Sequence, residues 1–388
     1  MKKVNSQTTP IYRNSGFLFD SPEQMKEVMT TPSADRVDQW TYSRYENPTT
    51  ASAEGKIARL EGAGYALLAP SGMAAIDISL SVFQRGTATG KWMFFSELYG
   101  GTSKYIDRVL VGRRGINAVR INPEARVAGT AEMLEKAFAE HKPDLIYFES
   151  ITNPMLTVPE AAIIIEMARK AGIRVIVDNT FASPLLWKPL ADGADIVVHS
   201  ATKYLAGHGD LMAGYLAVNE KSLWEAAHDY RQFCGYIISP DDASRLESYL
   251  QSFDCRMNCH IDSAGQLARF LRNKTSKIES VIYPGLEGDP SHANAKALFG
   301  GKGYGAIITF KLSGATSVEK KKKAAEFCRK VAGKINIVPT LGNAATTMLP
   351  VNDYWIDKAT DEGIIRLSVG VEPYGQIEKT INDALETI

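Results

Sequence analysis

The sequence lacks the features that mark membrane proteins, nucleic-acid binders and secreted proteins. Its 388 residues carry 44 Lys and Arg against 44 Asp and Glu, so the formal net charge is zero and no overall field attracts nucleic acid or an anionic membrane. No stretch approaches the roughly 18 uninterrupted apolar residues of a spanning helix. Lys2 and Lys3 have no apolar run behind them, which argues against a secretory signal. We therefore expect small-molecule partners and further copies of the same chain, with no nucleic-acid or membrane partner.

Cysteine is also scarce. Four cysteines in so long a chain do not make a disulfide framework, so a cytoplasmic location is expected. One helical turn could align Cys255 and Cys259 beside His260, but no second ligand pair is evident and we predict no metal site. A buried helix face is the simpler explanation of this segment.

The length fits roughly two domains, and a composition of 45% hydrophobic and 23% charged residues is typical of a globular protein. Residues 1–54 are rich in Thr, Ser, Pro and Asn and lack a sustained period. They are interpreted as an N-terminal arm that contacts a neighbouring subunit, the alternative being a loosely packed terminus.

Residues 55–240 alternate short apolar runs with helical patterns, which predicts a large α/β domain with a mostly parallel sheet flanked by helices. Ligands of such sheets bind beyond the carboxyl ends of the strands. In residues 241–388 the regular alternation of strand and helix patterns is replaced by one long helical pattern followed by mixed strands and helices. This change predicts a smaller C-terminal α+β domain. Strands are expected over 65–69, 91–95, 145–148, 174–177, 195–199, 306–310 and 364–369, and helices over 72–83, 159–171, 242–272 and 318–332.

Chemically active residues follow several of these strands. Ser71 and Gly72 open a helix after one strand, where free N–H groups form an anion site, although a simple N-cap explains them too. Asp178 ends a very apolar strand, and alone would be explained as a helix cap. Ser200 to Lys203 follow another strand, about one crossover unit later, so the lysine and the acid can reach the same end of one sheet.

Two more strand ends add an amide and an aromatic ring. Asn153 stands in an Asn-Pro sequence that turn chemistry alone would explain, and Tyr99 could equally be a core tyrosine beside a glycine turn. Together the set matches the needs of pyridoxal phosphate (PLP). That cofactor requires a lysine for its aldehyde, a carboxylate for its ring nitrogen, and amides and hydroxyls for its phosphate.

The order of these motifs resembles, over nearly the whole chain, the cystathionine γ-synthase, γ-lyase and β-lyase group. This group is the transsulfuration branch of the fold-type I PLP enzymes. The segments that carry the resemblance are Tyr42–Thr49, Ser71–Ala75, Tyr99–Thr102, Asp178–Pro184, Ser200–Tyr204 and Ile365–Gly370. The resemblance implies the fold-type I architecture and a tetramer built from two active dimers.

The resemblance also implies a role for each matching residue. Lys203 would hold PLP as a Schiff base and shuttle protons. Tyr99 would stack on the ring and assist the exchange of amines, and Asn153 would bind both cofactor and substrate. Arg366 would clamp the substrate α-carboxylate, a task suited to a bidentate donor, with Thr340 beside it. The remaining cofactor contacts would come from Asp178, Thr180, Ser71, Gly72, Met73, Ser200 and Thr202, and from Tyr42 and Arg44 of a neighbouring subunit.

The chain departs from the family pattern where substrates are chosen. Ala345 replaces a glutamate that many members keep near the substrate side chain, and the segment 352–355 replaces a Met-Thr-His sequence. Gly101 stands where methionine γ-lyases often carry cysteine, which argues against that activity. Tyr45 and the Asn47–Thr50 segment resemble γ-synthases. The expectation is γ-replacement on an O-acylated homoserine with a thiol acceptor. The alternative is C–S elimination of the cystathionine or methionine γ-lyase type or the cystathionine β-lyase type.

Two other hypotheses about the function have less support in the sequence. Ser200 and Lys203 fit the Ser-x-x-Lys motif of penicillin-binding hydrolases, but Ser-Asp-Asn and Lys-Thr-Gly do not occur. A non-catalytic binding module would be expected to lose Lys203 or Asp178 first, and both are present.

Overall fold

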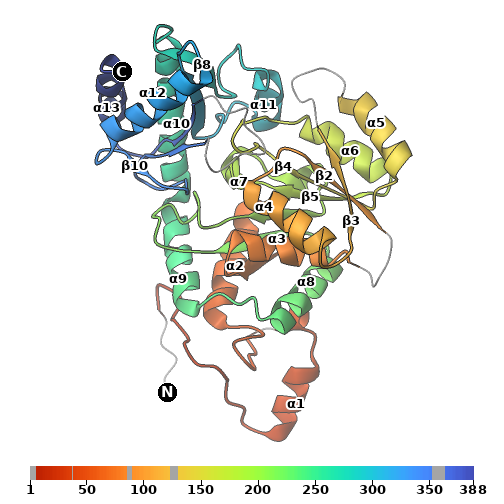
Figure 1. Ribbon diagram of the computed structural model, residues 1–388. Helices are drawn as coiled ribbons and strands as arrows, with labels where there is room; N and C mark the ends of the chain where they lie inside the picture. The colour runs from red at the N-terminus through yellow and green to blue at the C-terminus, as the bar shows by residue number, and fades with distance from the viewer. Residues whose placement is uncertain (1–5, 37, 85–89, 123–129, 352–362) are drawn as a thin grey trace.

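The computed structural model describes residues 6–36, 38–84, 90–122, 130–351 and 363–388. Two sheet-containing lobes lie side by side, and an N-terminal arm with helix α1 (Pro22–Thr30) extends from the larger lobe (Figure 1). The segment 352–355, noted above as a departure from the family, lies outside the described residues.

The larger lobe contains a seven-stranded sheet in the order β1-β7-β6-β5-β4-β2-β3. Strand β7 runs antiparallel to both of its neighbours, whereas the other pairs are parallel. The mostly parallel sheet is therefore confirmed. The strands are β1 (Tyr65–Ala69), β2 (Lys91–Phe95), β3 (Asn117–Ile121), β4 (Leu145–Glu149), β5 (Arg174–Asp178), β6 (Ile196–His199) and β7 (Gly214–Val218).

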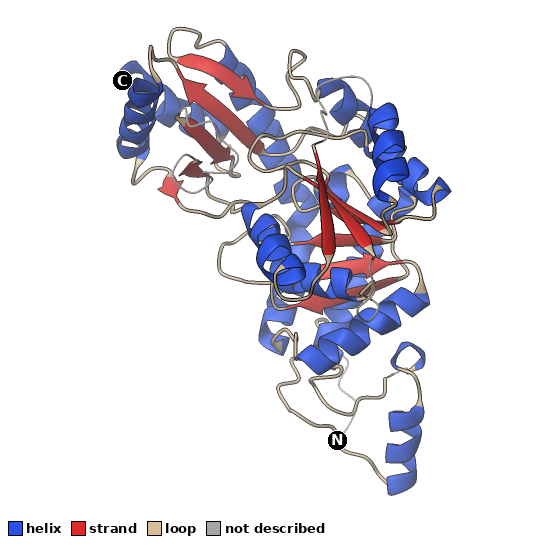
Figure 2. Ribbon diagram, turned by 45° about the vertical axis from the view of Figure 1, so that its right-hand side comes forward, coloured by secondary structure: helices blue, strands red, loops and turns tan. Residues whose placement is uncertain are grey.

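The central strands are apolar runs because helices cover both faces of the sheet (Figure 2). All five residues of β4 and of β7 are buried. The helices of this lobe are α2 (Pro48–Glu61), α3 (Gly72–Ser81), α4 (Gly100–Tyr105), α5 (Thr130–His141), α6 (Ala161–Lys170), α7 (Ser183–Leu186) and α8 (Lys221–Cys234). The expected boundary at residue 55 falls inside α2.

The single helix expected over residues 242–272 is wrong, because the chain forms α9 (Pro240–Tyr249), a 3₁₀ turn (Leu250–Ser252) and α10 (Phe253–Arg272). Arg256 explains part of the interruption. Its guanidinium donates to the Tyr249 carbonyl at 3.0 Å, and also to the carbonyls of Tyr204 and Leu205, each at 2.8 Å. The Arg256 side chain therefore connects the interruption between α9 and α10 to the segment that follows Lys203.

The smaller lobe contains a five-stranded sheet in the order β10-β11-β12-β9-β8, as the expected α+β character requires. Its strands are β8 (Ile278–Ile282), β9 (Ile307–Leu312), β10 (Asn336–Ile337), β11 (Thr347–Pro350) and β12 (Ile364–Ser368). Its helices are α11 (His292–Phe299), α12 (Ser317–Val331) and α13 (Tyr374–Glu386).

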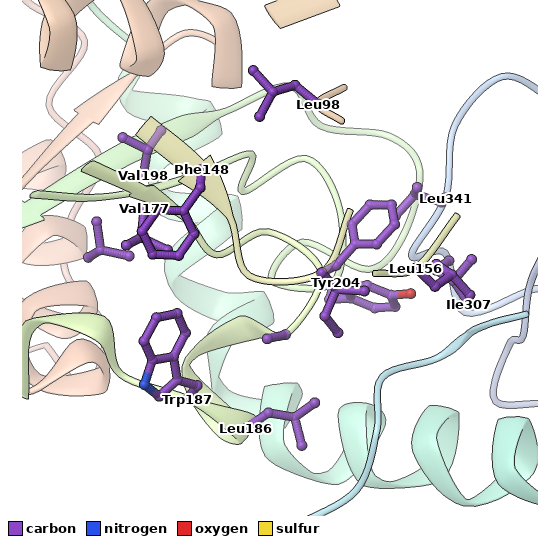
Figure 3. Packing of buried hydrophobic residues seen from close by; sticks show 14 of the residues in the cluster. Leu98, Phe148, Leu156, Val177, Leu186, Trp187, Val198, Tyr204, Ile307 and Leu341 are labelled. Atoms are coloured by element: carbon purple, nitrogen blue, oxygen red, sulfur yellow. The ribbon is translucent and has the colours of Figure 1, made fainter. Parts of the chain in front are cut away.

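The two lobes share one hydrophobic cluster. Leu156 and Tyr204 of the larger lobe and Ile307 and Leu341 of the smaller one belong to it (Figure 3). Next to Leu341, Gly342 has φ +77°, and a Cβ there would lie 2.8 Å from the Tyr204 backbone nitrogen. Only glycine fits so close a contact in this conformation, so the small-lobe loop lies directly on the main chain beside Lys203.

A glycine also determines how β7 meets the start of α3. A Cβ at Gly214 would lie 2.2 Å from the Ser71 carbonyl oxygen. Gly214→Ala should therefore destabilise the protein by about 1–3 kcal/mol through overpacking, seen as a lower midpoint in thermal unfolding. Gly375→Ala is the matched control, because nothing lies within 4 Å of its Cβ and alanine favours a helix. Equal midpoints for the two variants would contradict the packing argument.

Candidate active site

A cavity of about 610 Å³ opens at the carboxyl ends of the large-sheet strands and reaches the smaller lobe. It lies where an α/β sheet binds its ligands. Its lining includes twelve of the fourteen residues expected to hold cofactor or substrate: Ser71, Gly72, Met73, Tyr99, Asn153, Asp178, Thr180, Ser200, Thr202, Lys203, Thr340 and Arg366.

One end of the cavity is the N-terminus of α3. The Ser71 hydroxyl caps this helix by accepting from the Ala74 amide at 3.1 Å, so the N-cap explanation and the anion-site explanation both apply. The first amides of a helix have no acceptor within the helix, which leaves those of Gly72 and Met73 for a ligand. A Cβ at Gly72 would lie 2.8 Å from the Ser200 Cβ. Glycine is required for this close approach.

The Asp178 carboxylate lies at the end of β5 and is buried. Its Oδ1 accepts from the Thr180 hydroxyl at 2.6 Å and from the Thr180 amide at 3.0 Å, while Oδ2 accepts from the Tyr147 hydroxyl at 3.2 Å. Burial raises the pKa of Asp178, and the Thr180 contacts oppose that rise. The Thr180 hydroxyl also accepts from the Ser200 amide at 2.9 Å, which connects the acid to the lysine segment.

Lys203 lies in the turns that follow β6. Its Nζ donates to the Thr340 hydroxyl at 2.8 Å. Burial and then the nearby Arg366 charge lower the pKa of Lys203 to about 8, so a minor but appreciable fraction of the amine is neutral near physiological pH. Upstream, Thr202 exchanges two 3.0 Å hydrogen bonds with the Ala213 backbone and fixes this turn. Because the turn is not a helix, the geometry does not suit a Ser-x-x-Lys hydrolase.

Arg366 on β12 supplies a buried positive charge. Its side chain donates to the Asn153 amide oxygen at 3.1 Å and to the Thr340 carbonyl at 3.3 Å. Burial lowers the pKa of Arg366 to about 10. Within the described parts of the chain no carboxylate forms an ion pair with it, and its Nε–H has no hydrogen-bond partner there. The site can therefore accept a carboxylate from a ligand.

Tyr99 lies at the cavity wall with 43% of its surface exposed. Its amide donates to the Glu149 carboxylate, which positions the residue before α4. A Cβ at Gly101 would lie 2.4 Å from the Tyr99 ring. The ring could not keep this position beside a cysteine at residue 101.

Tyr42 and Arg44 do not line the cavity of their own chain. Arg44 donates to the Gln232 carbonyl at 2.7 Å, and its guanidinium lies 5.4 Å from the centre of the Tyr42 ring and 4.7 Å from that of Tyr45. Their expected contact with a neighbouring subunit stays a prediction.

Several residues of the cavity wall were not predicted from the sequence, among them Glu149, Asp210, Met212 and Leu341. Glu149 is the last residue of β4, and this strand-end position is the signal that could have identified it. The other three lie on loops next to predicted site residues: Asp210 and Met212 follow the Ser200–Tyr204 segment, and Leu341 follows Thr340.

The expected buried face around Cys255 and Cys259 is wrong, because both thiols are exposed. His260 alone is buried, with Nδ1 2.6 Å from the Val369 carbonyl oxygen. Among the residues that the structure describes, no three His, Cys, Asp or Glu side chains are arranged to hold a metal ion.

The lining fits PLP. The helix terminus with its glycine suits a phosphate, the buried Asp178 suits a protonated ring nitrogen, and the partly neutral Lys203 amine suits an aldehyde. A family model described as Cys/Met metabolism PLP-dependent enzyme matches residues 1–386. The chain belongs to this family. It is therefore a PLP-dependent enzyme of sulfur amino-acid metabolism with the expected architecture.

Individual relatives differ in activity. The chain is 32% identical to a cystathionine gamma-lyase of Bacillus subtilis, covering 100% of this chain and 96% of the relative. It is 35% identical to an L-methionine gamma-lyase of Fusobacterium nucleatum, covering 98% and 93%. A solved cystathionine gamma synthase of Xanthomonas oryzae, in complex with aminoacrylate and cysteine, has a TM-score of 0.86 at 26% identity, covering 98% of this chain and 92% of that one. No helix among the described residues is long and apolar enough to cross a membrane.

The positive charge of Arg366 should affect how the rate of PLP capture by the apoprotein depends on pH. Capture of PLP should accelerate as pH rises through about 8 and then level off, because only the neutral Lys203 amine attacks an aldehyde. Arg366→Gln should move this midpoint to higher pH, since the positive charge that lowers the pKa of Lys203 is lost. Stopped-flow absorbance of PLP binding measures both. An unchanged or lower midpoint in the variant would contradict the assignment, and Lys203→Ala should abolish covalent capture.

Proposed function

We propose that the protein catalyses γ-replacement on an O-acylated homoserine, with a thiol such as cysteine as the acceptor. The observation that carries the proposal is the Lys203 amine, which donates to Thr340 and lies under the influence of the buried Arg366 charge, in a cavity with room for more than a cofactor. When bound, PLP supplies an electron sink for the charge that develops at the substrate Cα.

Arg366 and Asn153 bind and orient the amino-acid substrate. The guanidinium donates hydrogen bonds to the α-carboxylate, and the hydrogen bond that it donates to the Asn153 side chain holds it toward the cavity. Fixing the carboxylate directs the Cα–H bond toward Lys203 and lowers the entropic cost of the reaction.

The Lys203 amine then removes the Cα proton and returns it later. A base works best when its pKa lies near the working pH, which fits the lowered pKa of about 8. Thr340 holds Nζ at 2.8 Å and so limits the positions that the amine can take. Both γ-replacement and elimination need this step.

The far part of the cavity would receive the γ-substituent and the incoming thiol. Leu211, Met212, Leu341 and Asp210 are lining residues of the cavity, and we place this part of the cavity beside them. Ala345 lies in the loop that follows Leu341, where many family members place a negative charge. This wall is where we propose that substrate choice is made.

Elimination is the second candidate, and the names of the relatives favour it. The two relatives described above at 32% and 35% identity are lyases. The Asn47–Thr50 segment, which resembles γ-synthases, favours replacement instead, whereas Gly101 argues only against a methionine γ-lyase.

A substrate test separates the two candidates. Purified PLP-loaded protein is supplied with O-acetylhomoserine or O-succinylhomoserine, with and without cysteine, and separately with cystathionine or methionine. Replacement predicts cystathionine only when cysteine is present. Keto acid and ammonia from cystathionine or methionine alone would instead identify a lyase.

We further propose that the working unit is a homotetramer of two active dimers, in which Tyr42 and Arg44 reach the phosphate of a neighbouring subunit. Arg44→Gln and Lys203→Ala homo-oligomers should each be nearly inactive. Refolding the two together should restore part of the wild-type rate, because some hybrid sites combine an intact Lys203 with an intact Arg44. No recovery, with mixed oligomers verified by mass, would contradict the shared site. The expected cytoplasmic location stays a prediction.

A further inference from the structure

The Asp178 carboxylate has room for one more hydrogen bond, and its position is determined by a buried tyrosine. An ionised carboxylate offers about four acceptor positions, shared equally between its two oxygens. Oδ1 accepts from the Thr180 hydroxyl at 2.6 Å and from the Thr180 amide at 3.0 Å, so both of its positions are filled. Oδ2 accepts from the Tyr147 hydroxyl at 3.2 Å, and among the described residues no second donor is hydrogen-bonded to it. A ligand N–H group is therefore best accepted at Oδ2, the oxygen that Tyr147 contacts.

Tyr147 reaches Asp178 from the neighbouring strand. Tyr147 of β4 is in register with Ile176 of β5. Side chains two residues apart lie on the same face of a strand, so Tyr147 and Asp178 share one face of the sheet. The Tyr147 side chain has no exposed surface, and its ring packs on that of Phe94 with centres 6.0 Å apart. This packing fixes the place of the hydroxyl.

The Tyr147 hydroxyl can act on the site only through Asp178, because Asp178 lines the cavity and Tyr147 does not. Burial, followed by the charges of Asp178 and Glu149, raises the pKa of Tyr147 well above its ordinary value. The phenol therefore stays protonated and remains a donor. With Thr180 on one oxygen and Tyr147 on the other, the carboxylate cannot turn about its Cβ–Cγ bond without losing a hydrogen bond, which is costly in a buried site.

We propose that Tyr147 is a positioning residue, whose hydroxyl holds Oδ2 of Asp178 so that the remaining acceptor position of this oxygen receives the protonated ring nitrogen of PLP. An acceptor that is already oriented needs no rearrangement when the ligand binds, and this adds to affinity. Burial raises the pKa of Asp178, and the Tyr147 hydrogen bond is one of the contacts that oppose this rise. The role concerns the cofactor, so it is the same for γ-replacement and for elimination.

Binding of two ligands to the apoprotein isolates this role. One is PLP, and the other is its analogue in which a C–H group replaces the ring nitrogen, so that it offers no N–H group to Asp178. The measured quantity is the ratio of the two dissociation constants, followed by quenching of tryptophan fluorescence. Any effect on packing, phosphate or lysine acts on both ligands and cancels in the ratio, whereas an effect through the ring nitrogen does not.

Tyr147→Phe keeps the ring and removes only the hydroxyl. In this variant the preference for PLP over the analogue should fall by about tenfold, the lower end of what a hydrogen bond to a charged group contributes. The reason is that Oδ2 can turn away from the ring nitrogen and that the carboxylate takes up a proton more easily. In an Asp178→Asn background, adding Tyr147→Phe should leave the ratio unchanged, since the hydroxyl acts through the carboxylate.

A second buried tyrosine of the same sheet provides the matched control. The Tyr215 hydroxyl donates to the buried Glu61 carboxylate at 2.6 Å. Tyr215 is in register with His199, whereas Asp178 is in register with the residue before it, so Tyr215 and Asp178 lie on opposite faces of the sheet. Tyr215→Phe removes the same kind of hydrogen bond and should leave the ratio at the wild-type value.

An unchanged ratio in Tyr147→Phe, with both ligands weakened equally, would overturn the proposal and leave Tyr147 a purely structural residue. An equal fall of the ratio in Tyr215→Phe would overturn it as well. If Tyr147→Phe does not fold, 3-fluorotyrosine introduced at position 147 decides by the same ratio. Its hydroxyl is a stronger donor of nearly the same size, so the preference for PLP should rise, and a preference that does not rise would contradict the proposal.

Discussion

The small-lobe loop lies so close to Lys203 that a Cβ at Gly342 would meet the Lys203 carbonyl carbon at 2.9 Å. The site depends on this contact, because it brings Thr340 within 2.8 Å of Nζ. Arg256 of α10 donates to the Tyr204 and Leu205 carbonyls. The main chain that follows Lys203 is thus held both by the Gly342 loop and by Arg256.

The two sheets contribute opposite charges to the cavity. Asp178 brings a carboxylate from the large sheet, Arg366 brings a guanidinium from the small sheet, and Lys203 lines the same cavity. Asp178 and Arg366 are buried, where electrostatic interactions are strong. The pKa of Lys203 is lowered by burial and by the Arg366 charge, so a charge suited to a ligand carboxylate also keeps part of the lysine amine neutral.

The sequence predicted which residues of the large sheet line the cavity, because parallel strands bring their carboxyl ends to one edge. Asp178, Lys203 and the Ser71 turn each follow an apolar run that is easy to recognise. Strands β3 and β7 of the large sheet were missed, as were β8, β10 and β11 of the small sheet. Strand β3 is a partly exposed edge strand, and β7 begins with a glycine that packs against α3.

The remaining features depend on contacts between residues far apart in the chain. The break after α9 contains no glycine or proline, and Arg256 makes its contacts only in the folded protein. Tyr147 and Asp178 lie on different strands, 31 residues apart in the numbering, and no local pattern indicates that their side chains meet. The cavity wall around Met212 and Leu341 is likewise formed by loops of two lobes, so substrate choice is the part that sequence motifs describe least.

The buried guanidinium of Arg366 has a consequence for selectivity. Among the residues that the structure describes, only neutral oxygens accept from it, so any amino acid that offers an α-carboxylate relieves the cost of its burial. Such binding is uniform, since it stabilises ground state and transition state alike and does not distinguish a good leaving group from none. Abundant unreactive amino acids would therefore compete for the site, and the flux through the enzyme would follow the composition of the surrounding amino-acid pool as well as its own substrate.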